Sequence, residues 1–195
     1  MSVPERKRLS AQDWVDAATA VLASGGVAAV AVEPLAARLG TTKGSFYWHF
    51  ANRDALLEAT LLEWERQATE DVIVLVDDEP DARTRLHRLM GIALAGDPER
   101  PGERMELTLL ATADHPLVAP VLARVTARRL DYLERQFREL GFPAPEARRR
   151  CTLAYTAYLG HAQLAHATPD AAPHGPALAA YVDSVIEVLT TGGRG

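Results

Sequence analysis

Along most of the chain, apolar residues recur at every third or fourth position, which is the spacing of one face of an α-helix. The first such stripe lies close to the N-terminus and consists of Trp14, Ala17, Ala18, Val21 and Leu22. No segment sustains the alternation of apolar and polar residues that marks a β-strand. The pattern therefore predicts an all-α protein.

Capping residues and helix breakers set the expected ends of about nine helices. Ser10 and Asp13 have the spacing of a capping box, so the first helix is expected over residues 10–24. A long connector helix is expected to begin at Asn52 and to end before Pro80. The later ranges are 82–95, 103–113, a segment between Pro120 and Gly141, 146–166 and 176–191.

The charge distribution divides the chain in the same way as the helices do. Residues 1–50 hold five basic and four acidic residues, whereas the remainder holds 16 basic and 22 acidic ones. We therefore expect a head over residues 1–54 and an acidic body over residues 55–195, with the connector helix shared between them. Arg6, Lys7 and Arg8 form either an arm that reaches DNA or a merely solvated terminus.

The segment from Glu33 to Leu57 has the outline of a helix-turn-helix. A short apolar stripe ends at Gly40, and glycine adopts the left-handed conformation that ends a helix. Thr41 or Thr42 can cap a second helix over about 43–48. That helix is too short to be stable alone, so tertiary packing must hold it.

The residue types in this second helix suit contact with DNA. Lys43, Gly44 and Ser45 offer a cation, a position without a side chain and a small hydroxyl, which permit close approach to a groove. Tyr47 and His49 can donate hydrogen bonds to phosphate oxygens. Phe46 and Phe50 are instead expected to anchor the helix in the core.

A specific run of residues supports this interpretation: a leucine–alanine helix before Gly40, then Lys43-Gly44-Ser45, an aromatic pair, His49-Phe50 and Asn52-Arg53-Asp54-Ala55-Leu56. The run resembles the tetracycline-repressor-like (TetR) family of transcriptional regulators. It departs from that family at Val30-Ala31-Val32, where a capping Ser or Thr is usual. The residues expected to contact DNA are Thr42, Lys43, Gly44, Ser45, Tyr47, Trp48, His49 and Arg53.

Composition fits a globular protein of the cytoplasm. The chain has 195 residues, 48% of them hydrophobic and 24% charged, and a net charge of −5. The single cysteine, Cys151, excludes an intrachain disulfide and a cysteine-cluster zinc site. The uncharged run between Arg150 and Asp170 contains threonine, histidine and glutamine, so we expect a buried helix there and no membrane span.

Small and apolar residues on the last two long helices suggest a dimer surface. Two helices from each subunit would form a four-helix bundle, as the family resemblance also implies. The alternative is that the same face packs inward on its own subunit. The residues are Ala147, Cys151, Ala154, Tyr158, Ala162, Leu178, Tyr181, Val182, Val185 and Leu189.

The resemblance further implies an apolar pocket for a small-molecule effector in the body. A mixture of aromatic residues, methionine and a few polar groups suits such a site, although each residue taken singly fits plain core better. The candidates are Trp64, His87, Met90, Met105, Leu109, Tyr155, Tyr158 and His161.

Neither a catalytic motif nor a metal or cofactor motif is present in the sequence, so we expect no enzyme. Arg148-Arg149-Arg150 is either a nucleic-acid patch or the solvated start of a helix. The resemblance implies a homodimeric repressor that binds a palindromic DNA operator and is released by a small-molecule effector. A constitutive repressor or an activator without ligand response stays open, as does a small helical enzyme.

Overall fold

The computed structural model describes residues 9–95 and 101–192, and for residues 101–104 it describes the backbone alone. Within these ranges the secondary structure is entirely helical, as the sequence predicts. Arg6, Lys7 and Arg8 lie outside the described residues. The elements are α1 (Ala11–Gly25), η1 (Val27–Ala29), α2 (Val32–Arg38), α3 (Lys43–Phe46), α4 (Arg53–Glu65), η2 (Arg66–Glu70), α5 (Asp71–Asp77), α6 (Ala82–Ala95), α7 (Pro101–Leu110), α8 (Val118–Glu139), α9 (Ala144–Ala167), η3 (Pro169–Ala171) and α10 (Pro176–Thr190).

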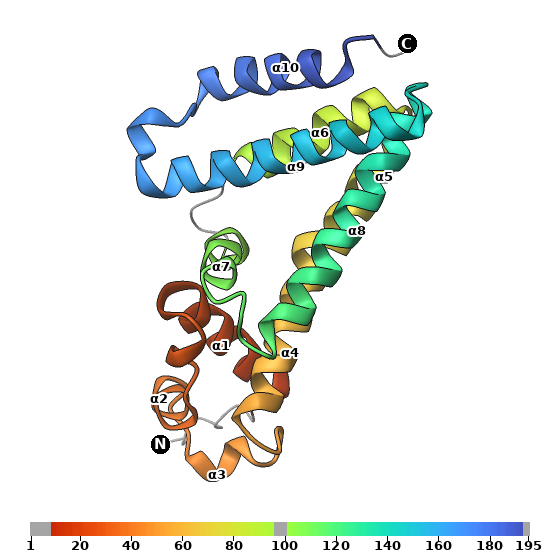
Figure 1. Cartoon of the computed structure of the whole chain (residues 1–195). Coiled ribbons are helices and arrows are strands. Elements are labelled where there is room, and N and C mark those ends of the chain that lie inside the picture. Colours follow the sequence, from red (N-terminus) through yellow and green to blue (C-terminus); the bar gives the residue numbers. More distant parts are fainter. Residues whose placement is uncertain (1–8, 96–100, 193–195) are drawn as a thin grey trace, which may run out of the picture.

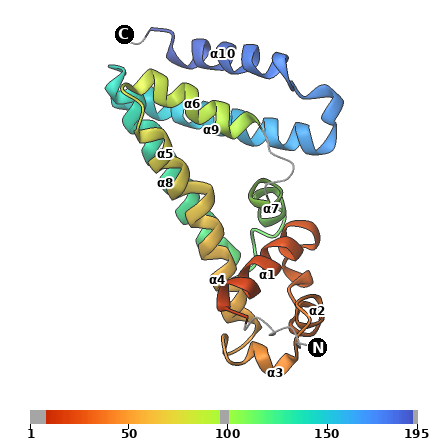
Figure 2. The same cartoon turned by 180° about the vertical axis from the view of Figure 1, so that it is seen from behind.

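The molecule is elongated, with a small head at one end and a helical layer at the other (Figure 1). The head contains α1, α2 and α3, and the far layer contains α6, α9 and α10. Between them run α8 and a long rod made of α4, η2 and α5, which the view from behind also shows (Figure 2). Counting this rod as one helix gives nine helices in the described ranges.

Local sequence signals place several of these helix ends. The Ser10 side chain accepts a hydrogen bond from the Asp13 amide, and the Asp13 carboxylate accepts one from the Ser10 amide, which completes the predicted capping box. The Asn52 side chain accepts a hydrogen bond from the Ala55 amide at 2.9 Å and begins α4. Each cap satisfies a backbone donor that the first helical turn leaves without an intrahelical partner.

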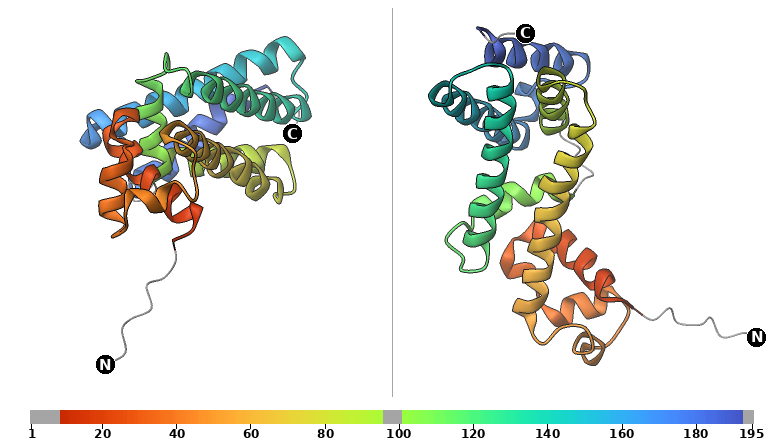
Figure 3. Two further views of the ribbon diagram at one scale, coloured as in Figure 1. Left: turned by 90° about the horizontal axis from the view of Figure 1, so that it is seen from below. Right: turned by 90° about the vertical axis from the view of Figure 1, so that its right-hand side faces the viewer.

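The apolar core of the head continues into the body. Trp14, Leu35 and Phe46 are fully buried in a cluster that also contains Met105 and Leu109 of α7. Valines of the first half of α8 complete the same cluster. Because α7 crosses between the rod and α8 (Figure 3, right), it joins the head to the rest of the molecule. A shift of α7 therefore disturbs the packing of the head directly.

The second core cluster corrects the expected dimer surface. Ala147, Cys151 and Ala154 are buried against α6 and α8, together with Val182 and Leu189 of α10. These side chains therefore point into their own subunit, which is the alternative that the sequence left open. The partly buried residues Leu178, Tyr181 and Val185 pack on the same cluster, Ala162 is half-buried, and Tyr158 lines a cavity.

The consecutive arginines at the start of α9 are held in local contacts. Arg148 and Arg149 form ion pairs with Glu134 and Glu146. The Arg150 guanidinium lies 4.0 Å from the centre of the Phe142 ring and donates hydrogen bonds to backbone carbonyls at the end of α10. Arg150 thus caps a helix C-terminus, where a cation is favourable.

None of the helices in the described ranges is long and apolar enough to span a membrane. Burial raises the pKa of the Cys151 thiol to about 12, so this cysteine is protonated at neutral pH.

Candidate DNA interface and internal cavity

The turn between α2 and α3 depends on Gly40. Its φ of +63° lies in the left-handed region that favours glycine. The Gly40 amide donates to the Ala37 carbonyl at 3.1 Å, and the Thr41 amide donates to the Ala36 carbonyl at 2.9 Å. This is the Schellman pattern, and it ends α2 sharply enough for α3 to follow after four residues.

Aromatic packing fixes the short helix α3 on the head. Phe46 is fully buried, with its ring centre 5.3 Å from that of Trp14 and 5.7 Å from that of Phe50. At the start of the helix, the Thr42 hydroxyl accepts a hydrogen bond from the Ser45 amide at 3.4 Å. Anchoring through Phe46 leaves the opposite side of α3 free to face solvent.

The exposed side of α3 and the residues directly before and after this helix carry most of the residues expected to contact DNA. Thr42, Lys43 and Gly44 are exposed, while Ser45 and His49 are half-buried. Tyr47 is 55% exposed and Trp48 is 84% exposed, which is unusual for aromatic side chains of this size. Aromatic rings exposed to water directly after a short helix indicate a surface that meets a partner.

Lys43, the expected base contact, is held by an ion pair in the free protein. Its Nζ lies 2.6 Å from Oε1 of Glu33 on α2. The hydrogen bond from Lys43 lowers the pKa of Glu33, and the same bond raises the pKa of Lys43. Both side chains are exposed, so salt screens the pair and a phosphate or base can compete for the ammonium group.

Arg53 has a role that the sequence did not reveal. Its Nε donates to the Val30 carbonyl at 2.6 Å, and its Nη2 donates to the Val27 carbonyl at 2.5 Å. Its Nη1 forms an ion pair with Asp54. These bonds tie the start of α4 to the loop between α1 and α2, so the guanidinium positions the head. No local pattern signals contacts that are 23 and 26 residues apart.

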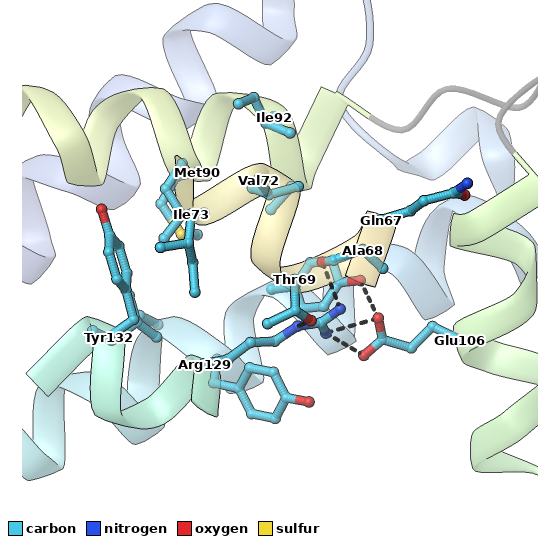
Figure 4. A pocket seen from close by; sticks show the side chains of 16 residues that line it. Gln67, Ala68, Thr69, Val72, Ile73, Met90, Ile92, Glu106, Arg129 and Tyr132 are labelled. Carbon is cyan, nitrogen blue, oxygen red and sulfur yellow. Dashed lines mark hydrogen bonds and ion pairs between the residues drawn. The ribbon is translucent and has the colours of Figure 1, made fainter. Parts of the chain in front are cut away.

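The body contains a cavity of about 370 Å³. It lies between the rod, α6, α7, α8 and α9, and its walls are mostly apolar (Figure 4). The 16 lining residues are Gln67, Ala68, Thr69, Val72, Ile73, Leu89, Met90, Ile92, Ala93, Glu106, Arg129, Tyr132, Leu133, Ala154, Tyr155 and Tyr158. A cavity of this size and polarity suits a small organic ligand.

Three of the eight residues expected in an effector pocket, Met90, Tyr155 and Tyr158, line this cavity. Trp64, Met105 and Leu109 are buried in the first core cluster instead. His87 lies at the surface with its Nε2 2.8 Å from Asp183 Oδ1, and His161 stacks on Tyr181 with burial lowering its pKa. These five have helical spacing that fits a core as well as a pocket, which explains the difference.

A buried ion pair forms one end of the cavity. Nη1 of Arg129 donates to both carboxylate oxygens of Glu106, at 2.7 and 2.8 Å, and the Tyr158 hydroxyl donates to Oε2 at 2.7 Å. Burial alone would lower the pKa of Arg129, but the Glu106 carboxylate outweighs it and raises the pKa above its ordinary value. Burial and then Glu106 raise the pKa of the Tyr158 hydroxyl. Arg129 and Tyr158 therefore both stay protonated at neutral pH.

The sequence carries a faint signal for this pair. Glu106 stands between Met105 and Leu107, shortly before Leu109 and Leu110. A charged residue at a core position needs a buried partner. The partner could not be read from the sequence, because Arg129 follows Arg128 in a run that is typical of a solvated face.

The connector rod contains one π-helical turn, η2, at the wall of the cavity. The Asp71 amide donates to the Arg66 carbonyl, five residues back, so this turn holds one residue more than a turn of α-helix. Within the turn, the Ala68 carbonyl and the Thr69 hydroxyl both accept hydrogen bonds from Arg129, each at 3.1 Å. The extra residue therefore lies where the rod meets the buried ion pair.

The π-turn also keeps two carboxylates in line. Glu65 and Glu70 pair with Arg124 and Arg128, which are four residues apart on α8. In a regular α-helix, residues five apart differ by about 140° around the axis and could not both face α8. The additional residue in η2 brings Glu70 to the position that a residue four along would take. The two ion pairs depend on this turn.

The arrangement of the head defines the class of the protein. A short, solvent-facing helix, held after a glycine turn on a three-helix scaffold, is a helix-turn-helix of the DNA-binding kind. Residues 15–60 match the description of bacterial regulatory proteins of the tetR family. No curated protein sequence matches the chain.

Solved structures share the fold along the whole chain. A transcriptional regulator from Rhodococcus sp. Rha1 has a TM-score of 0.77 at 19% identity, covering 96% of this chain and 99% of its own. FadR from Bacillus subtilis, solved with stearoyl-CoA, has a TM-score of 0.71 at 18% identity, covering 94% and 99%. A protein from Saccharomonospora viridis, solved with choline, has a TM-score of 0.70 at 18% identity, covering 92% of each chain. The head thus matches the tetR family of bacterial regulatory proteins over residues 15–60, and the whole chain shares the fold of these solved structures.

Because η2 contains one extra residue, deleting a single residue there should destabilise the protein less than deleting one elsewhere in the rod. Deleting Gln67 turns η2 into regular α-helix without rotating its flanks, so we expect a loss of about 1–2 kcal/mol in the free energy of unfolding. Deleting the exposed Glu58 in α4 instead rotates one half of that helix by about 100° and should cost more than about 4 kcal/mol. Urea unfolding of both variants checks this, and equal losses would contradict the register argument.

Proposed function

We propose that the protein is a homodimeric repressor that binds a palindromic DNA operator and is released from it by a small-molecule effector. The observation that carries the proposal is the exposed face of α3, with Lys43, Gly44 and Tyr47, on a head whose core continues into the cavity-bearing body. A repressor of chromosomal genes works in the cytoplasm.

In the proposed complex, the N-terminal end of α3 enters the major groove. Gly44 lets the backbone approach the bases, and Lys43 exchanges Glu33 for a base or phosphate acceptor. Tyr47, Trp48 and His49 lie beside the phosphate backbone, and Thr42 and Ser45 offer hydroxyl groups. Arg53 acts indirectly, because its guanidinium is engaged with the Val27 and Val30 carbonyls.

The dimer surface is proposed on the outer faces of α9 and α10, opposite the buried face. Leu153 is 51% exposed, and Thr156, Gly160 and Leu164 follow it at helical spacing on exposed positions. On α10, Val188 is exposed with small residues one and two turns before it. Small side chains beside isolated leucines permit close helix packing, as in a four-helix bundle. Two heads are then available for two half-sites.

Release of the operator is proposed to start in the cavity. Its wall includes the rod, which carries α4 of the head, and α7, which packs on α1. A ligand that favours one arrangement of these helices shifts the separation of the two α3 helices. Two neighbours in fold, solved with stearoyl-CoA and with choline, support a small-molecule effector. Neither compound is assigned to this chain.

Gly44→Ala tests the DNA interface without disturbing the fold. A Cβ at Gly44 meets only the Thr42 hydroxyl at 3.6 Å, so the head should fold normally, yet the methyl group blocks close approach to DNA. We expect operator affinity to fall roughly tenfold or more. Gly91→Ala, another helical glycine with open space around it, is the matched control and should leave affinity unchanged.

Gel shifts at one stated salt concentration measure the effect, on DNA that flanks the gene or on duplexes selected from a random pool. The Lys43→Ala, Tyr47→Ala double variant should lose specific binding. Wild-type protein that selects no preferred duplex, or a Gly44→Ala variant that binds as the wild type does, would contradict the proposed interface.

Leu153→Arg tests the proposed dimer surface. A charge placed in an apolar helix interface is unfavourable because it is desolvated without a partner, so we expect monomers at micromolar concentration. Leu62→Arg changes a leucine of similar exposure, 56%, on α4 and should stay dimeric. Sedimentation velocity distinguishes the two states. A dimeric Leu153→Arg variant would place the interface elsewhere.

A further inference from the structure

The cavity wall holds two opposite charges. Of the 16 residues that the described part of the chain contributes to it, Arg129 and Glu106 are the charged ones. Their side chains are 14% and 4% exposed, so both charges are buried. The other lining residues are apolar or carry neutral hydroxyl, phenol or amide groups. The wall is therefore charged at one end but has no net charge.

Each of the two charges already has its partners. Both oxygens of Glu106 accept hydrogen bonds from Arg129, and one of them accepts another from Tyr158. Arg129 directs its Nε and Nη2 donors to Thr69 and to the Ala68 carbonyl. Figure 4 shows Arg129, Glu106, Thr69 and Ala68 lying together on one side of the cavity. Each charge is therefore already paired within the protein and needs no ligand of opposite sign.

These contacts decide what a bound molecule meets. To pair with Arg129, an anionic head group would have to break the ion pair between Arg129 and Glu106. The Glu106 carboxylate would then be buried with Tyr158 as its remaining partner. A cationic head group would have to take Glu106 from Arg129. Removing one partner from a buried ion pair is strongly unfavourable, because the other charge stays desolvated and unpaired. An uncharged molecule leaves the pair intact and gains contact with the apolar wall.

Resting on the proposed function, in which this cavity is the effector site, we propose that the effector is an uncharged, largely apolar small molecule. The Arg129–Glu106 pair excludes carboxylate and ammonium analogues of the same shape. The pair thus sets ligand specificity by excluding charged ligands.

Three probes with the same eight-carbon chain separate the possibilities: 1-octanol, octanoate and octylammonium. Their dissociation constants for the purified full-length protein are measured without DNA by isothermal titration calorimetry. We expect 1-octanol to bind roughly 100-fold more tightly than either charged probe. Octanoate or octylammonium within about threefold of 1-octanol would overturn the proposal, as would no binding of any probe.

Variants that unbalance the pair give the sharper comparison, because every apolar cavity favours an alcohol over an ion to some degree. Glu106→Gln keeps the shape of the side chain and an acceptor for Tyr158 but leaves Arg129 unpaired. The affinity of octanoate relative to 1-octanol should then rise roughly tenfold or more. Arg129→Gln leaves Glu106 unpaired and should raise the relative affinity of octylammonium in the same way. An unchanged ratio in both variants would overturn the proposal.

The neighbouring ion pair supplies matched controls. Arg128→Gln and Glu70→Gln remove the same kinds of charge from a pair between α8 and η2, which lies outside the cavity wall. Both should leave the three affinities unchanged, and circular dichroism checks that every variant is folded. The titrations contain no DNA, so they test ligand selectivity independently of operator release. If the protein shows this selectivity but 1-octanol does not release the operator, the proposed function is contradicted and the proposed ligand class is not.

Discussion

The buried ion pair between Arg129 and Glu106 is the interaction on which the arrangement of the body depends. A charge inside a protein is stable only with its partner, so the helices that carry the two residues cannot separate without a large cost. Arg129 belongs to α8, Glu106 to α7, and the groups that Arg129 also binds belong to η2 of the rod. Tyr158 adds α9. One guanidinium and one carboxylate thus hold four elements at the edge of the cavity.

Two of these elements reach the head. The rod continues into α4, which Asn52 caps and Arg53 ties to the loop before α2. Helix α7 shares an apolar cluster with α1 and with Phe46 of α3. In the proposed mechanism, a ligand beside the ion pair acts on the head through the rod and through α7 at the same time. It can do so only as far as its affinity differs between the DNA-bound and released arrangements.

Local signals in the sequence predicted the head well. The capping box of Ser10 and Asp13, the left-handed Gly40 and the N-cap Asn52 act through neighbours within a few residues, so spacing alone predicts them. The orientation of α9 was harder, because small residues occupy both of its faces and helical spacing does not say which face is inside. The π-turn and the Arg129–Glu106 pair arise from contacts distant in sequence. Glu106, placed between Met105 and Leu107, was the one hint of them.

The central claim is that the cavity and the DNA interface are coupled, and the most direct test is the operator dissociation constant with and without a ligand in the cavity. With 1-octanol at a concentration shown by calorimetry to saturate the protein, we expect operator affinity to fall by about 5- to 150-fold, the usual range of such coupling. By linkage, the operator should weaken the binding of 1-octanol by the same factor. Equal operator affinities for the free and the saturated protein would contradict the coupling.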